Sequence, residues 1–165
     1  MDETLSLTFP GAIGTEAPDF TLKNQHREDW MLSAQRGKIV LLLFYPGSET
    51  LVCTKQLCSV RDRWDEYLET GAEVVGISPG SIEEHRRFAA SHSLPLTLLS
   101  DSQRIVTKKY LGAWSPLHRA MRLLVVIDTE GIVRHRRVMV RAFRPADKWS
   151  LTAIRMAQYQ SLTKR

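Results

Sequence analysis

The sequence predicts one three-layer α/β domain, in which helices cover both faces of a central sheet. Apolar runs of strand length alternate with segments of helical periodicity, and the last two runs flank a tight turn. A further helical segment ends the chain. The length of 165 residues suits a single domain with a substantial buried core. We therefore expect residues 1–165 to fold as one domain.

The first half of the chain begins with short extended pieces and continues with a buried strand and a helix. Extended pieces are expected at Phe20–Leu22 and Trp30–Leu32, around a polar turn. The near-continuous apolar run Ile39–Tyr45 is typical of a strand that is buried on both faces. Apolar side chains then recur at helical spacing from Thr50 to Thr70, and Gly71 follows where a helix would end.

The second half continues this alternation and closes with a hairpin and a helix. Glu73–Ile77 is expected to be a second buried strand. Ser81 and Glu84 form the capping-box pattern of a helix that runs to about Ser93. The remaining expected elements are a strand at 96–99, a short helix at 105–111, a hairpin of 123–127 with 132–140, and a helix from about Ala146.

The composition excludes several classes of protein. A hydrophobic content of 43% and a charged content of 25% are ordinary for a globular protein. No apolar run has the length of a membrane span, and the acidic start Met1–Thr4 lacks the pattern of a secretion signal. Two cysteines are too few for a secreted disulfide scaffold, so the cytoplasm is the expected compartment. Neither a nucleotide-binding glycine motif nor a metal-binding histidine spacing occurs, so no cofactor and no metal are expected.

The net charge of +5 owes much to a cluster of arginines near the end of the chain. Such a cluster could attract nucleic acid or acidic partners. No nucleic-acid-binding motif accompanies it, so a solvated basic surface is the preferred interpretation and nucleic acid is not an expected partner. The cluster comprises Arg134, Arg136, Arg137, Arg141 and Arg144.

The two cysteines, Cys53 and Cys58, follow the strand expected at Ile39–Tyr45. Cys53 falls at the junction with the next helix, in the first helical turn. A helix N-terminus has unpaired N–H groups and partial positive charge, and both favour the reactive thiolate. A thiolate is a good nucleophile, and these N–H groups and the Thr50 hydroxyl can stabilise negative charge on a leaving oxygen. Pro46 ends the strand, and its ring can shield the sulfur from water.

Taken singly, these residues have ordinary structural explanations. A Cys behind a buried strand is often only a small hydrophobic residue, and Thr50 could simply be a helix N-cap. Their coincidence at one strand-to-helix junction favours the functional explanation.

The spacing Pro-x-x-x-Thr-x-x-Cys, from Pro46 to Cys53, resembles the active-site signature of the peroxiredoxins. Cys58, five residues later, resembles the peroxiredoxin Q, or bacterioferritin-comigratory-protein, group, and the likeness covers nearly the whole chain. The resemblance implies a thioredoxin-like fold with the peroxiredoxin N-terminal extension. It also implies an antioxidant thiol peroxidase that acts on hydrogen peroxide and organic hydroperoxides. Leu51 and Val52 replace the Pro-Gly that is usual in this group, so the mouth of the pocket is expected to differ.

The same resemblance implies an arginine that enters the site from a strand ending in an apolar-Asp-x-x-Gly turn. The matching stretch runs from Met121 to Gly131, and Arg122 occupies the matching position. A guanidinium there would lower the pKa of Cys53 and polarise a bound peroxide. Arg119 is the second choice for this role. The ordinary alternative for Arg122 is a surface position, which is usual for an Arg that opens a strand.

Cys58 raises a geometric problem. Five residues along a regular helix give about 7.5 Å of rise and about 140° of rotation, which separates the two Cα atoms by about 8.7 Å. A disulfide requires less than about 7 Å. Either the pair never bridges or the helix unwinds during turnover. The resemblance favours the second option, in which Cys58 resolves the Cys53 sulfenic acid and thioredoxin or a similar dithiol reduces the disulfide.

An intramolecular bridge needs no partner subunit, so a monomer is expected. Two alternatives stay open. The chain could be a redox sensor or binding module on the same fold, in which oxidation alters a partner contact. It could also be a basic nucleic-acid-binding protein in which both cysteines are structural.

Overall fold

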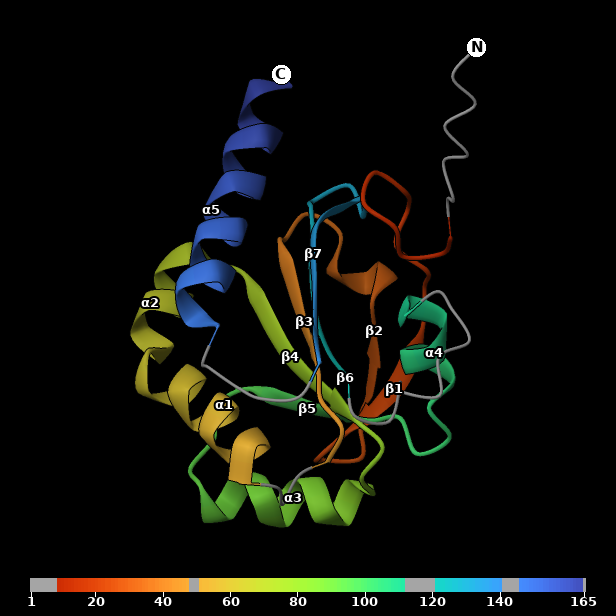
Figure 1. Ribbon diagram of the computed structural model, residues 1–165, viewed down its shortest axis with the longest axis vertical. Helices are drawn as coiled ribbons and strands as arrows, with labels where there is room; N and C mark the ends of the chain where they lie inside the picture. The colour runs from red at the N-terminus through yellow and green to blue at the C-terminus, as the bar shows by residue number, and fades with distance from the viewer. Residues whose placement is uncertain (1–8, 48–50, 112–120, 141–145, 165) are drawn as a thin grey trace.

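The computed structural model describes residues 9–47, 51–111, 121–140 and 146–164 (Figure 1). Within them, strands and helices alternate as the sequence predicts. The strands are β1 (Thr21–Asn24), β2 (Asp29–Met31), β3 (Val40–Phe44), β4 (Glu73–Ser78), β5 (Thr97–Ser100), β6 (Met121–Ile127) and β7 (Val133–Val140). The helices are α1 (Leu51–Asp62), α2 (Trp64–Thr70), α3 (Ile82–Ser91), α4 (Ile105–Leu111) and α5 (Asp147–Thr163), with a short 3-10 helix at Ser33–Gln35.

The strands form one mixed sheet in the order β2-β1-β5-β4-β3-β6-β7. Strands β3, β4 and β5 are parallel, so their carboxyl ends share one edge of the sheet. β6 runs antiparallel to β3 and pairs Leu123 with Phe44 and Ile127 with Val40. Because of this direction, the start of β6 lies beside the end of β3. The topology therefore brings Met121 and Arg122, the first residues of β6, to the edge from which α1 departs.

Alternate side chains of β3 enter two separate cores. Leu41 and Leu43 pack in the core formed with α1, α2, α3 and α5, whereas Val40, Leu42 and Phe44 pack in the core formed with α4 and the segment around β1 and β2. Figure 1 shows α1, α2 and α5 on one side of the sheet and α4 on the other. The predicted three-layer α/β architecture is confirmed.

The expected single helix over 50–70 is in fact two helices. Arg63 separates α1 from α2 with φ −111° and ψ 20°, outside the helical region. Its N–H still donates to the carbonyls of Ser59 and Val60, both at 3.2 Å. The bend turns α2 so that Tyr67 packs toward α5, where its hydroxyl donates to Asp147 at 2.6 Å. Periodicity did not reveal this break, because the apolar side chains keep helical spacing across Arg63.

The predicted helix signals are confirmed. Gly71 ends α2 in the left-handed conformation, with φ 69°. The Ser81 hydroxyl accepts the Glu84 N–H at 3.1 Å, and the Ser81 N–H donates to the Glu84 carboxylate at 2.8 Å. Both partners of the capping box are thus satisfied, which fixes the start of α3.

The described segment before β1, residues 9–20, includes contacts with the β6–β7 turn. The Ala17 N–H donates to the Gly131 carbonyl at 2.8 Å, and Glu16 pairs with Ile132 as an isolated antiparallel bridge. Along the part of the chain that the structure describes, no helix has the length and apolar character needed to cross a bilayer.

Candidate functional site

Cys53 lies at the junction between β3 and α1, as predicted. β3 ends at Phe44, and Cys53 is the third residue of the 12-residue helix α1. The Tyr45 N–H donates to the Ile77 carbonyl at 3.0 Å, and the half-buried Pro46 follows directly. The first four N–H groups of a helix have no partner within it, so this turn offers donors to an anion. Thr50 and the Cys53 side chain lie outside the described residues.

Cys58 lies on the same helix and is a half-buried free thiol. It packs against the core that contains Leu57 and Val60, which are almost fully buried. Because α1 spans both cysteines, the two Cα atoms are held about 8.7 Å apart by helix geometry. A bridge between Cys53 and Cys58 therefore requires α1 to unwind.

Arg122 lies on β6, the strand next to β3, and its side chain contacts α1. It is the second residue of β6 and is only 4% exposed. Strand alternation puts it on the face of Leu124 and Val126, which pack in the core beneath α1. Its Nη1 donates to Oε1 of Gln56, which is also buried. Arg122 is thus a buried residue rather than the surface residue that an arginine at the start of a strand usually is.

Gln56 is a candidate site residue that sequence reasoning missed. It follows Cys53 by three positions in α1, and residues at this spacing share a helix face. The bond to Gln56 therefore joins the Arg122 guanidinium to α1 three residues after Cys53. The available signal was weak, because a glutamine between Lys55 and Leu57 is equally compatible with a solvent-facing position. Arg119, the second choice, lies outside the described residues.

A buried histidine lies at the same edge of the sheet. Ser78 ends β4, and its hydroxyl lies 2.5 Å from Nε2 of His85 in α3. Both side chains are fully buried. Burial lowers the pKa of His85 to about 4, so the imidazole is neutral at pH 7. This contact joins the start of α3 to the end of β4, the strand next to β3.

The depressed pKa of His85 predicts a loss of stability in acid. Unfolding returns His85 from a pKa of about 4 to 6.5, so the unfolded chain binds the proton more tightly. The contribution of neutral His85 to the free energy of unfolding is therefore fully present above pH 6.5. It falls by about 3 kcal/mol as the pH drops toward 4. His85→Gln should remove most of this dependence in urea unfolding at pH 7.0 and 4.5. The matched control His26→Gln, at an exposed position, should retain it; equal slopes in both variants would contradict the assignment.

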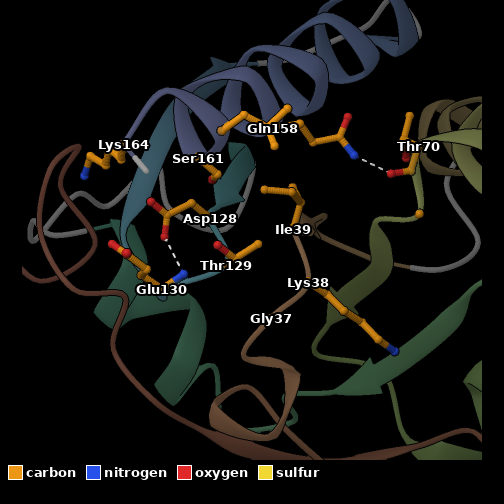
Figure 2. Close-up of a pocket in the computed structure, with 12 residues that line it drawn as sticks. Gly37, Lys38, Ile39, Thr70, Asp128, Thr129, Glu130, Gln158, Ser161 and Lys164 are labelled. Carbon is orange, nitrogen blue, oxygen red and sulfur yellow. Dashed lines mark hydrogen bonds between the residues drawn. The ribbon is translucent and has the colours of Figure 1, made fainter.

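A cavity of about 520 Å³ lies at the opposite end of the sheet (Figure 2). Figure 2 shows side chains from the β6–β7 turn, the end of α5 and the segment before β3 around it. On one side, Nε2 of Gln158 donates to the Thr70 carbonyl. Cys58 and Arg122 lie at the other end of β3 and do not line this cavity. Its lining residues include Gly37, Lys38, Asp128, Glu130, Ser161 and Lys164.

The described arginines of the basic cluster are engaged within the fold. Arg134 binds the buried Asp128 carboxylate at 2.6 Å. Arg136 donates to two backbone carbonyls at the end of α4, and the Arg137 guanidinium lies 5.9 Å from the Trp149 ring centre. These contacts explain the arginines without a nucleic-acid partner. The remaining two, Arg141 and Arg144, lie outside the described residues.

Comparison with known proteins gives consistent matches. The profile of the AhpC/TSA family matches residues 13–136. Peroxiredoxin Q, chloroplastic, from Triticum aestivum is 43% identical over 124 residues, which are 74% of this chain and 57% of that protein. The protein of the same name from Sedum lineare is 44% identical over 123 residues, which are 73% of this chain and 66% of that protein. The chain thus spans less than two thirds of the length of these relatives, and their chloroplastic names do not support the expected cytoplasmic location.

Solved structures share the fold. The peroxidoxin BcpB from Mycobacterium tuberculosis has a TM-score of 0.74 and 31% identity, covering 87% of this chain and 96% of that one. The reduced 2-Cys peroxiredoxin of Plasmodium vivax has a TM-score of 0.73 and 28% identity, and the match covers 90% of this chain and 98% of that one. The fold is therefore thioredoxin-like, as the sequence resemblance implied. The chain belongs to the AhpC/TSA family, and its relatives group it with the peroxiredoxins of the Q, or bacterioferritin-comigratory-protein, type.

Proposed function

We propose that the chain is a thiol peroxidase that reduces hydrogen peroxide and organic hydroperoxides with Cys53 as the nucleophile. The observation that carries the proposal is the buried Arg122, which donates to Gln56 on the face of α1 that carries Cys53. A buried cation beside a helix N-terminus favours a thiolate and attracts the polar O–O group of a peroxide. Membership of the AhpC/TSA family supports the same chemistry.

In the first step, the Cys53 thiolate attacks one peroxide oxygen. A sulfur–oxygen bond forms, the O–O bond breaks, and the other oxygen takes a proton and leaves as water or an alcohol. The negative charge on the leaving oxygen is stabilised by the N–H groups at the start of α1, the Thr50 hydroxyl and the Arg122 guanidinium. Pro46, at the entrance to α1, limits access of water to the sulfur. Cys53 ends this step as a sulfenic acid.

In the second step, the Cys58 thiol attacks the Cys53 sulfenic acid. A disulfide forms and water leaves, which requires α1 to unwind locally. An external dithiol such as thioredoxin then supplies two electrons and two protons and restores both thiols. Because the bridge is internal, the cycle needs no second subunit, and the proposed active form is a monomer with residues 1–165 as one domain.

Peroxide consumption in the presence of thioredoxin, its reductase and NADPH tests the proposal. We expect many turnovers per protein molecule, with NADPH oxidised in proportion to the peroxide consumed. Oxidation that stops after one equivalent would favour a redox sensor on this fold. A rate equal to that of the coupling enzymes alone would contradict the peroxidase assignment.

A further inference from the structure

Asp147 is a buried carboxylate that joins three helices. It is the first residue of α5 and is 4% exposed. Its Oδ1 accepts the Tyr67 hydroxyl of α2 at 2.6 Å, and its Oδ2 accepts the Ser59 hydroxyl of α1. Burial, together with the hydrogen bond to Asp147, raises the pKa of Tyr67 far above its usual range, so Tyr67 stays protonated and donates. One carboxylate thus fixes both α1 and α2 to α5.

The two donors differ in their relation to the cysteines. Ser59 directly follows Cys58 on α1. To reach Cys53, Cys58 must leave its helical position, and this movement pulls Ser59 away from Asp147. Tyr67 belongs to α2, beyond the break at Arg63, so it can remain bound while α1 unwinds.

We propose that the Ser59–Asp147 hydrogen bond is a latch that holds Cys58 away from Cys53. It stabilises the dithiol form, in which α1 is intact, relative to the disulfide form, in which α1 is unwound. The latch therefore slows resolution of the sulfenic acid and makes the bridge easier to reduce. This inference rests on the proposed two-cysteine mechanism, and it makes Asp147 and Ser59 positioning residues for Cys58.

Ser59→Ala should favour the disulfide. Ala removes the donor without disturbing the helix, since it is the strongest helix former and Ser59 is only half-buried. Loss of a hydrogen bond to a carboxylate should shift the dithiol–disulfide equilibrium about tenfold toward the disulfide. For a two-electron couple, a tenfold change lowers the reduction potential by about 30 mV. The rate of bridge formation after peroxide should rise by a similar factor.

Tyr67→Phe is the matched control, because it removes a hydrogen bond to the same carboxylate from α2, which lies beyond the break at Arg63. It should lower the stability of both redox forms alike and leave the reduction potential unchanged. Ser59→Thr keeps a hydroxyl and should retain the wild-type potential. Asp147→Asn weakens the acceptor while keeping its volume, and should shift the potential in the same direction as Ser59→Ala.

The experiment equilibrates each protein with reduced and oxidised dithiothreitol at a series of ratios. Free thiols are then alkylated, and intact mass gives the disulfide fraction. A lower potential for Ser59→Ala with an unchanged Tyr67→Phe supports the latch. Equal potentials in wild type and Ser59→Ala, or an equal shift in Tyr67→Phe, would overturn the latch but leave the peroxidase intact. A wild-type protein that consumes peroxide without ever forming the bridge would overturn the latch and the resolving role of Cys58 together.

Discussion

Cys53→Ser should abolish peroxide reduction, lowering the rate by about 10³-fold or more, because a serine hydroxyl is not ionised near neutral pH. The serine retains the shape of the helix start, so the fold should be unchanged. Peroxide consumption with thioredoxin as the reductant measures the loss. Circular dichroism of the variant checks that the fold is intact.

Cys58→Ser separates the nucleophile from the resolving residue. This variant should react with the first equivalent of peroxide as fast as the wild type, but it should lose thioredoxin-dependent turnover. Full turnover in Cys58→Ser would remove Cys58 from the mechanism. Substantial activity in Cys53→Ser would contradict the assignment of the nucleophile.

Arg122→Met should lower kcat/KM for hydrogen peroxide by about 10²–10³-fold, since it removes a charged donor from a buried site. Met has a similar length and fills the space beneath α1. Without the guanidinium, less Cys53 is present as thiolate at neutral pH, so alkylation by iodoacetamide should also slow. Steady-state kinetics and the alkylation rate measure these two effects independently.

Gln56→Leu is the control for the position of the guanidinium. It keeps the charge of Arg122 but removes the oxygen to which Nη1 donates. The loss in kcat/KM should be smaller than for Arg122→Met, about tenfold, because the charge remains in the site. If Arg122→Met stayed within a factor of about three of wild type while folding normally, Arg122 would have no catalytic part.

Local signals predicted most of the architecture. The apolar run of β3, the capping box at Ser81 and the αL glycine at Gly71 are properties of short segments, and the structure confirms all three. The placement of Arg122 near α1 also followed, although from a resemblance rather than from physical reasoning. Strand alternation supplies the physical reason, since it sends Arg122 to the same face as Leu124.

The features that sequence reasoning missed all depend on partners distant in the chain. The break at Arg63 accompanies the contact between Tyr67 and Asp147, 80 residues apart. Gln56 acquires its role only through Arg122, 66 residues later. A window along the chain contains neither partner, so local periodicity could not distinguish these side chains from ordinary polar positions.

The most direct test of the central claim is the intact mass of the reduced protein before and after one equivalent of hydrogen peroxide, without added thiol. The account predicts the loss of two hydrogens, with no dimer on a non-reducing gel, and a peptide map that joins Cys53 to Cys58. Rapid gain of oxygen on Cys53 without a bridge would contradict the resolving role of Cys58. An unchanged mass would contradict the peroxidase itself.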